Sequence, residues 1–154
     1  SRLVRNMAYG LAALGLESGD KAAIMAPTSY QWVASDLAII TAGGVSVPIY
    51  PTSSSSDIEH IINNSEARIV FVHNETLLHR VLAIRSKLPN LNKLILLSAP
   101  SKGKSLTELT VEEGLLIGLE EVLEKGRELE LFAAQVIDER LNTLSRDKLA
   151  TIIY

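Results

Sequence analysis

Apolar positions along the first hundred residues follow two alternating spacings. Short, mostly apolar runs rich in Val, Ile and Leu are typical of buried strands. Between them, apolar residues recur every three or four positions, as they do on one face of a helix. The runs predict four strands, over Ala22–Ala26, Val45–Tyr50, Arg68–Val72 and Lys93–Leu97.

The segments before and between these strands each show a helical apolar stripe. Because a helix in a globular protein packs its apolar stripe against the core, we expect these residues to be buried. The predicted faces are Leu3, Met7, Leu11 and Leu14; Val33, Leu37 and Ile40; Ile58, Ile61 and Ile62; and Leu77, Val81, Ile84 and Leu88.

Helix-start signals stand at the expected places. Thr28 with Gln31 and Ser56 with Glu59 have the spacing of a capping box, and Asn74 can cap the next helix. Gly15 and Gly43–Gly44 are natural helix stops. Strand and helix therefore alternate with short links, which predicts an α/β fold with a parallel βαβ sheet flanked by helices.

The pattern changes after Ser98. The segment to Thr110 is a polar loop, in which Ser105 and Glu108 form a third capping box. Two helices are predicted beyond it, over Leu115–Leu129 and Phe132–Leu144, followed by a last buried strand over Leu149–Tyr154.

Composition excludes several classes of function. The 154 residues contain 15 Lys and Arg against 18 Asp and Glu, and this mildly acidic balance argues against a nucleic-acid partner. The absence of cysteine excludes disulfides, a thiolate nucleophile and zinc–thiolate sites, and suits a cytoplasmic protein. The longest uncharged stretch, Leu37–Ser56, is interrupted by Gly and Pro, so we do not interpret it as a membrane span.

Three loops have residues that could bind an anion. Gly103-Lys104-Ser105 matches the end of a phosphate-binding loop, but Ser98 stands where the first Gly is required and Pro100 has no N–H to donate. We interpret this segment as a solvated loop. The hydroxyl residues of Ala26–Tyr30 and Thr52–Ser56 could bind an anion at a helix start, although helix capping explains them equally well and is the interpretation we favour.

No catalytic set emerges from the other reactive side chains. The histidines, His60, His73 and His79, lack the spacing of a helical metal site, and His73, at the end of a strand, is the one in a position that suits function. Trp32 is interpreted as a core or interface anchor. The acidic pairs Glu112–Glu113 and Glu120–Glu121 are interpreted as a solvated helix face.

Several stretches resemble the amino-terminal region of AMP-forming adenylating enzymes. The resemblance is strongest in Gly19–Ile24, Trp32 and Ala42–Thr52, and continues through Asp57–Val72 and Leu88–Leu91. The last residues, Asp147–Tyr154, look like the strand that leads into the phosphate loop Thr-Ser-Gly-Thr-Thr-Gly of that family. The Tyr-Pro-Thr and Ile-Ile-Tyr sequences look most like the long-chain fatty acyl-CoA synthetase branch.

The resemblance implies that residues 1–154 are a partial amino-terminal α/β subdomain, cut just before the phosphate-binding loop. The parent protein would use ATP and Mg²⁺ to convert a fatty acid to an acyl-adenylate, and would then transfer the acyl group to coenzyme A. No catalytic, cofactor-binding or metal residue of the family falls on this chain. Association of the parent with a membrane surface, self-association of the fragment and a cytoplasmic location are further expectations.

A stand-alone α/β ligand-binding or interaction module without catalysis is the alternative. A receiver-like module would need an acidic pair after its first strand, and a flavodoxin-like one would need Gly where this chain has Pro27. A non-catalytic interaction domain derived from the adenylating family also stays open.

Overall fold

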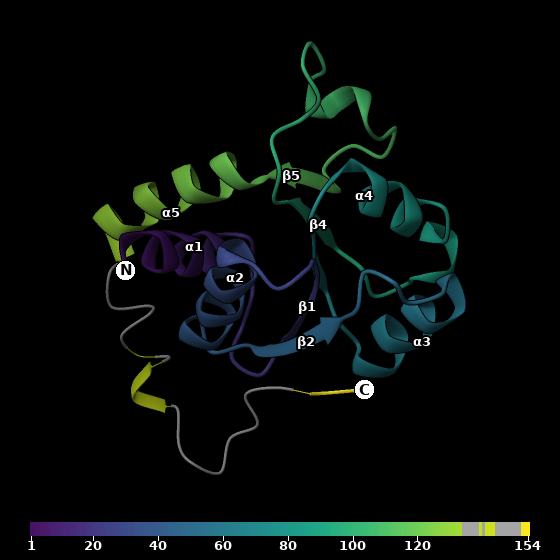
Figure 1. Ribbon diagram of the computed structural model, residues 1–154. Helices are drawn as coiled ribbons and strands as arrows, with labels where there is room; N and C mark the ends of the chain where they lie inside the picture. Colours follow the sequence, from purple (N-terminus) through teal and green to yellow (C-terminus); the bar gives the residue numbers. More distant parts are fainter. Residues whose placement is uncertain (134–138, 140, 144–151) are drawn as a thin grey trace.

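The computed structural model describes residues 1–133, 139, 141–143 and 152–154 (Figure 1). Helices and strands alternate along the described chain, together with two short 3₁₀ helices, η1 and η2. Their bounds, in chain order, are α1 Arg2–Ala13, β1 Lys21–Met25, α2 Tyr30–Thr41, β2 Val45–Ile49, α3 Ser55–Ser65, β3 Ile69–Val72, α4 Glu75–Leu82, η1 Arg85–Lys87, β4 Lys93–Leu96, η2 Leu106–Glu108, β5 Leu116–Gly118 and α5 Leu119–Ala133.

The five strands form one parallel sheet in the order β2-β1-β3-β4-β5. The central strand β1 pairs with β2 and β3, so that Ala23 lies opposite both Val47 and Val70. The predicted α/β class and parallel sheet are confirmed, and the four strands expected from the sequence all form within one residue of their predicted bounds.

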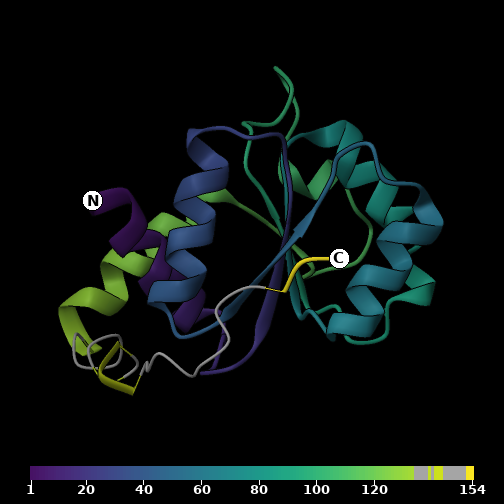
Figure 2. The same cartoon turned by 60° about the horizontal axis from the view of Figure 1, so that its bottom comes forward.

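Helices cover both faces of the sheet (Figures 1 and 2). Successive residues of β1 point to opposite faces: Ala22 and Ile24 pack in a cluster with α1, α2 and α5, whereas Ala23 and Met25 pack with α3 and α4. A parallel sheet buried on both faces needs apolar residues at every strand position, which explains why its strands lack alternation in the sequence.

Three helix starts test the predicted caps. Asn74 accepts a hydrogen bond from the amide of Leu77 at 3.0 Å, as predicted. The other two predictions were wrong by one or two residues, because Ser29 rather than Thr28 caps α2, and Ser54 rather than Ser56 caps α3. Runs of consecutive hydroxyl residues offer several equivalent caps, and the sequence spacing alone does not select among them.

The predicted buried face of α2 is also wrong. Val33 and Leu37 are exposed, whereas Ala34, Ser35, Ala38 and Ile39 are buried. Apolar residues lie on several sides of this helix, and the side with Ala34, Ala38 and Ile39 turns toward the sheet, whereas that of Val33 and Leu37 faces outward. The predicted faces of the third and fourth helices are buried, although α4 ends at Leu82 and Ile84 and Leu88 follow it.

The carboxyl-terminal part differs most from prediction. The expected helix over Leu115–Leu129 is instead the short strand β5 followed by α5. Most of the expected helix over Phe132–Leu144 lies outside the described residues, as does the first half of the expected strand over Leu149–Tyr154. Of that segment, the amide of Ile152 donates to the carbonyl of Ser46 on β2 at 2.9 Å. No helix within the described ranges is long and apolar enough to span a membrane.

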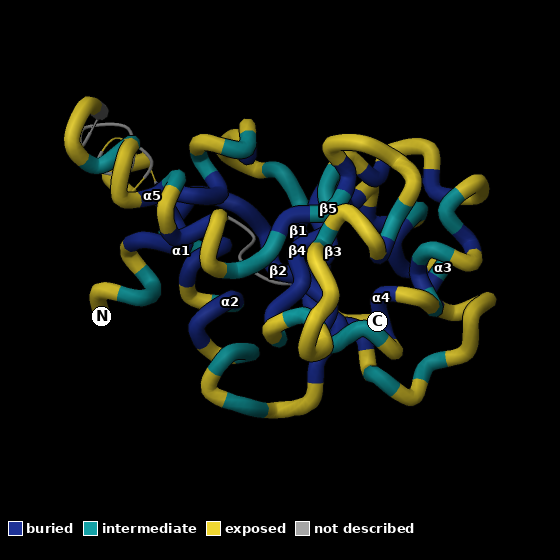
Figure 3. The backbone as a smooth tube through the Cα atoms, turned by 90° about the horizontal axis from the view of Figure 1, so that it is seen from above, coloured by how far each residue is buried: buried dark blue, intermediate teal, exposed yellow. Residues whose placement is uncertain are grey.

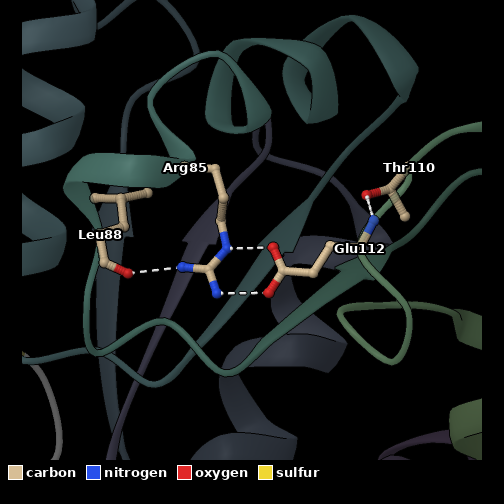
Figure 4. Close-up of polar contacts among 4 residues, drawn as sticks. All are labelled: Arg85, Leu88, Thr110 and Glu112. Carbon is tan, nitrogen blue, oxygen red and sulfur yellow. Dashed lines mark hydrogen bonds and ion pairs between the residues drawn. The ribbon is translucent and has the colours of Figure 1, made fainter.

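An ion pair fixes the loop before β5 (Figure 4). The Arg85 guanidinium donates from Nε and Nη2 to the two carboxylate oxygens of Glu112, both at 2.8 Å, and from Nη1 to the carbonyl of Leu88. These bonds lower the pKa of Glu112 below its usual value. Glu112 therefore holds the loop to η1, and the prediction that it belongs to a solvated helix face was wrong. Glu120 and Glu121 are exposed in the first turn of α5.

Helices α1 and α5 cross at a very short distance because glycines line the contact. A Cβ atom at Gly126 would lie 1.9 Å from the carbonyl oxygen of Asn6, and one at Gly10 would lie 2.2 Å from that of Val122. Both distances are far below a real contact, so the two backbones must separate if either residue gains a side chain.

We predict that Gly126→Ala destabilises the fold although Ala favours helix formation. In an exposed helix this change stabilises by roughly 0.5–1 kcal/mol, whereas overpacking a tight contact costs roughly 1–3 kcal/mol. Urea unfolding should show the loss, and the exposed Glu128→Ala on the same helix serves as the control. A Gly126→Ala variant as stable as the wild type would contradict the tight crossing.

Candidate functional site

The strand order reverses direction between β1 and β3. From β1 the chain moves outward to β2, and it then returns past β1 to β3 and continues to β4. In open parallel sheets, ligands bind beyond the carboxyl ends of the strands at such a reversal. The residues that follow β1 and β3 at this edge are Ala26 and His73, and they mark the candidate site.

Backbone and side-chain hydrogen bonds tie this edge together. The amide of His73 donates to the carbonyl of Met25 at 3.0 Å, and the amide of Ser98 donates to the carbonyl of His73 at 3.0 Å. Gln31, in the first turn of α2, donates from Nε2 to the carbonyl of Leu97 at 3.3 Å. Since β3 lies between β1 and β4, Gln31 bridges the strand ends that flank His73. Sequence reasoning did not single out Gln31 for this role.

His73 is half-buried, and its Nδ1 atom is buried without a hydrogen-bond partner. A buried polar atom without a partner is costly. Because this nitrogen is covered by protein atoms, a ligand reaches it only if neighbouring side chains move. The other histidines lie elsewhere: His60 is on α3, with its ring 6.2 Å from that of Tyr154, and His79 is exposed on α4.

The Gly-Lys-Ser loop faces a carboxylate of the protein itself. Ser101 donates from its amide to Glu75 Oε2 at 3.1 Å and from its hydroxyl to the same oxygen, and Lys104 Nζ lies 3.9 Å from Glu75 Oε1. The loop then enters the three-residue helix η2 without a side-chain cap from Ser105. The amide and hydroxyl of Ser101 and the Lys104 ammonium are therefore directed at Glu75, which the sequence had not indicated.

These contacts set the ionisation of Glu75. The hydrogen bonds from Ser101 are the main cause that lowers the pKa of this carboxyl below its usual value, with a smaller contribution from the charges of Lys104 and His79, and partial desolvation opposes them. Glu75 is thus held as an anion in the first turn of α4, where a negative charge also suits the helix dipole.

The two hydroxyl-rich loops, Ala26–Tyr30 and Thr52–Ser56, form hydrogen bonds within the protein. Ser29 and Ser54 cap α2 and α3. Arg80 of α4 donates to the carbonyl of Pro51 at 2.8 Å and to that of Ser53, and so fixes the loop after β2. Sequence reasoning missed Arg80, since its partners are backbone carbonyls of a loop distant in the sequence.

The described residues contain no cluster of three or more His, Asp or Glu side chains that could hold a metal ion. Trp32 is half-buried and packs against the core cluster of α1, α2 and α5. The site is a sheet edge joined by internal hydrogen bonds, at which His73 Nδ1 and Glu75 Oε1 are buried without a hydrogen-bond partner.

Fold and edge together define an α/β protein of the open parallel-sheet class, with the strand-order reversal between β1 and β3. The model of the family described as AMP-binding enzyme matches residues 1–154, so the chain belongs to that family. The resemblance to AMP-forming adenylating enzymes is confirmed.

Curated relatives are fatty acid–CoA ligases. A long-chain-fatty-acid–CoA ligase of Mycobacterium bovis is 34% identical over 107 residues, which are 68% of this chain and 18% of the relative. Another, from Rattus norvegicus, is 26% identical over 152 residues, or 99% of this chain and 20% of the relative. The chain thus spans about a fifth of the length of these relatives.

Solved structures show the same fold. The crystal structure of a long-chain-fatty-acid–CoA ligase from Archaeoglobus fulgidus superposes with a TM-score of 0.65 at 23% identity, and covers 81% of this chain and 22% of that one. At this identity the likeness establishes the fold alone, and the five-stranded parallel sheet is that of a part of an adenylate-forming enzyme.

We predict that Glu75 makes the stability of the protein depend on pH. Because its pKa is lower in the folded state than the ordinary value of about 4.3, its contribution is present above that value and is lost as the pH falls through the folded pKa. Between about pH 7 and about pH 3, the urea midpoint of the wild type should therefore fall further than that of Glu75→Gln. Glu113→Gln, in an exposed loop, is the control; equal pH dependence in wild type and Glu75→Gln would refute the role of Glu75.

Proposed function

We propose that this chain is the amino-terminal α/β subdomain of an ATP-dependent long-chain fatty acid–CoA ligase. The match of the AMP-binding enzyme family to all 154 residues carries the proposal. The branch follows from the curated relatives, because those of M. bovis and R. norvegicus are both long-chain-fatty-acid–CoA ligases.

The proposed reaction has two steps. The fatty acid carboxylate first attacks the α-phosphate of ATP, which forms the acyl-adenylate and releases pyrophosphate. The thiol of coenzyme A then attacks the acyl carbonyl, which forms the acyl-CoA thioester and releases AMP. Mg²⁺ would offset the charge of the phosphates in the first step, and no residue of this chain is assigned to hold it.

The role that we assign to residues 1–154 is that of a scaffold. At the carboxyl ends of the strands, Gln31 donates to the carbonyl of Leu97. Glu75 accepts a hydrogen bond from Ser101 and lies near Lys104 of the Gly-Lys-Ser segment. We therefore assign no catalytic, cofactor-binding or metal-binding residue here, and place the phosphate loop beyond Tyr154. Membrane-surface association of the longer ligase and self-association of the 154-residue chain belong to the same proposal.

The first test is nucleotide binding by the isolated chain. Because the loop amide and the Lys104 ammonium face Glu75, calorimetric titration with Mg-ATP should show no binding in the micromolar range, and acyl-CoA should behave alike. The same titration is carried out with the Glu75→Gln variant, because this change removes the carboxylate that occupies the loop. Micromolar binding by the wild type would contradict the scaffold role and would indicate that the Gly103–Ser105 loop is a phosphate site.

The second test is the activity of the complete reading frame. If Leu149–Tyr154 leads into a phosphate loop, the gene continues with hydroxyl and Gly residues followed by a Lys, since these supply amide donors and a positive charge to a triphosphate. The protein expressed from the complete frame should release pyrophosphate from ATP with palmitate but much more slowly with acetate. A stop codon directly after Tyr154 in the natural gene, or no fatty-acid-dependent release, would favour the stand-alone module.

A further inference from the structure

Residues 152–154 lie along the outer edge of the sheet. Among the described strands, β2 stands at one end of the strand order and pairs only with β1. On its free side, the amide of Ile152 donates to the carbonyl of Ser46 at 2.9 Å, and the Ile152 side chain packs against the core cluster of α3 and α4. Figures 1 and 2 show these last residues beside β2. The unpaired edge of β2 thus holds the segment that contains Tyr154.

Helix α3 contacts the same segment through two polar side chains. The helix has a buried side and an exposed side (Figure 3), and His60 and Asn64, four residues apart, lie on the exposed one. Asn64 Nδ2 donates to the hydroxyl oxygen of Tyr154 at 2.7 Å. The rings of His60 and Tyr154 lie edge to face, with their centroids 6.2 Å apart and their planes at 89°. Neighbouring turns of α3 therefore hold one tyrosine side chain.

Together these contacts define where the backbone of Tyr154 lies. Ile152 is fixed to β2 through its amide, and Tyr154 is fixed to α3 through its hydroxyl and its ring. Any residue that follows Tyr154 in a longer chain starts from this point. A phosphate-binding loop depends on such a starting point, because its backbone amides must be directed at the phosphate oxygens within a fraction of an ångström.

We propose that Asn64 and His60 are positioning residues for the phosphate loop. This inference rests on the proposed function, which places that loop beyond Tyr154. By holding the Tyr154 side chain against α3, the two residues set where the loop begins relative to the sheet, and so how its amides meet the triphosphate of ATP. They act through Tyr154 rather than by touching the nucleotide.

Steady-state kinetics of the protein expressed from the complete reading frame test the proposal. Asn64→Ala should raise the KM for Mg-ATP about three- to ten-fold, the range expected for the loss of one hydrogen bond. Because the loop binds the phosphates in the ground state and in the transition state alike, kcat should stay within about two-fold of the wild type. The KM for palmitate should not change. A merely structural role of Asn64 would instead lower the amount of active enzyme, and thus kcat, at an unchanged KM.

Three further variants show whether the effect passes through Tyr154. Tyr154→Phe should match Asn64→Ala, and the double variant should have the KM of either single variant, since both changes break the same hydrogen bond. His60→Ala removes the ring contact and should raise the KM for Mg-ATP about two- to ten-fold. Asn90→Ala, the same change as Asn64→Ala at an exposed position before β4, is the matched control and should behave as the wild type.

Hydrogen exchange of the same protein gives a measurement that needs no activity. The amide of Ile152 should exchange slowly in the wild type and in Asn90→Ala, and at least about three-fold faster in Asn64→Ala. If the wild type is active but Asn64→Ala has its KM for Mg-ATP, or if the two single effects add in the double variant, the inference is overturned and the proposed function stands. A wild type without fatty-acid-dependent pyrophosphate release overturns the proposed function and the role in the phosphate loop with it, whereas the exchange rates still decide whether α3 holds Tyr154.

Discussion

Burial of β1 on both faces is the constraint on which the rest of the structure depends. Ala22 and Ile24 on one face and Ala23 and Met25 on the other are excluded from water, so each face needs its own layer of helices. Helices α3 and α4 cover one face. Helices α1, α2 and α5 cover the other face. The close contacts at Gly10 and Gly126 let α5 cross α1 closely enough to pack on this face. The first and last described helices are thus parts of one layer.

Much of this arrangement could be predicted because it is encoded locally. Each of the four longer strands is a nearly unbroken apolar run, and Asn74 stands where a cap is needed, so neighbouring residues suffice to identify them. β5 has only three residues and forms through pairing with β4, a contact that no local sequence pattern predicts. The predicted buried face of α2 was wrong for a different reason. Apolar residues lie on several sides of this helix, so its sequence does not indicate which side faces the sheet.

The candidate site was predictable only in part. His73 follows a strand, and from this position alone the sequence places it at the carboxyl-end edge of the sheet, where the candidate site lies. Gln31 and Glu75 act on loops that lie 66 and 26 residues away in the sequence, so their roles depend on the strand order rather than on a motif. The same holds for Arg80, whose partners are backbone carbonyls. Residues that act through topology in this way leave no periodic or spacing signal.

These contacts support the scaffold role that we propose for a sheet edge in the position of a ligand site. Phosphate binding needs free amide donors and an uncompensated positive charge at a strand end. Here the amide of Ser101 and the charge of Lys104 are directed at Glu75, and Gln31 joins the neighbouring strand ends. The edge is therefore held in a fixed shape by its own hydrogen bonds. We propose that, within a longer adenylate-forming enzyme, this edge supports a neighbouring phosphate loop; His73 Nδ1 and Glu75 Oε1 are the buried atoms at this edge without a hydrogen-bond partner.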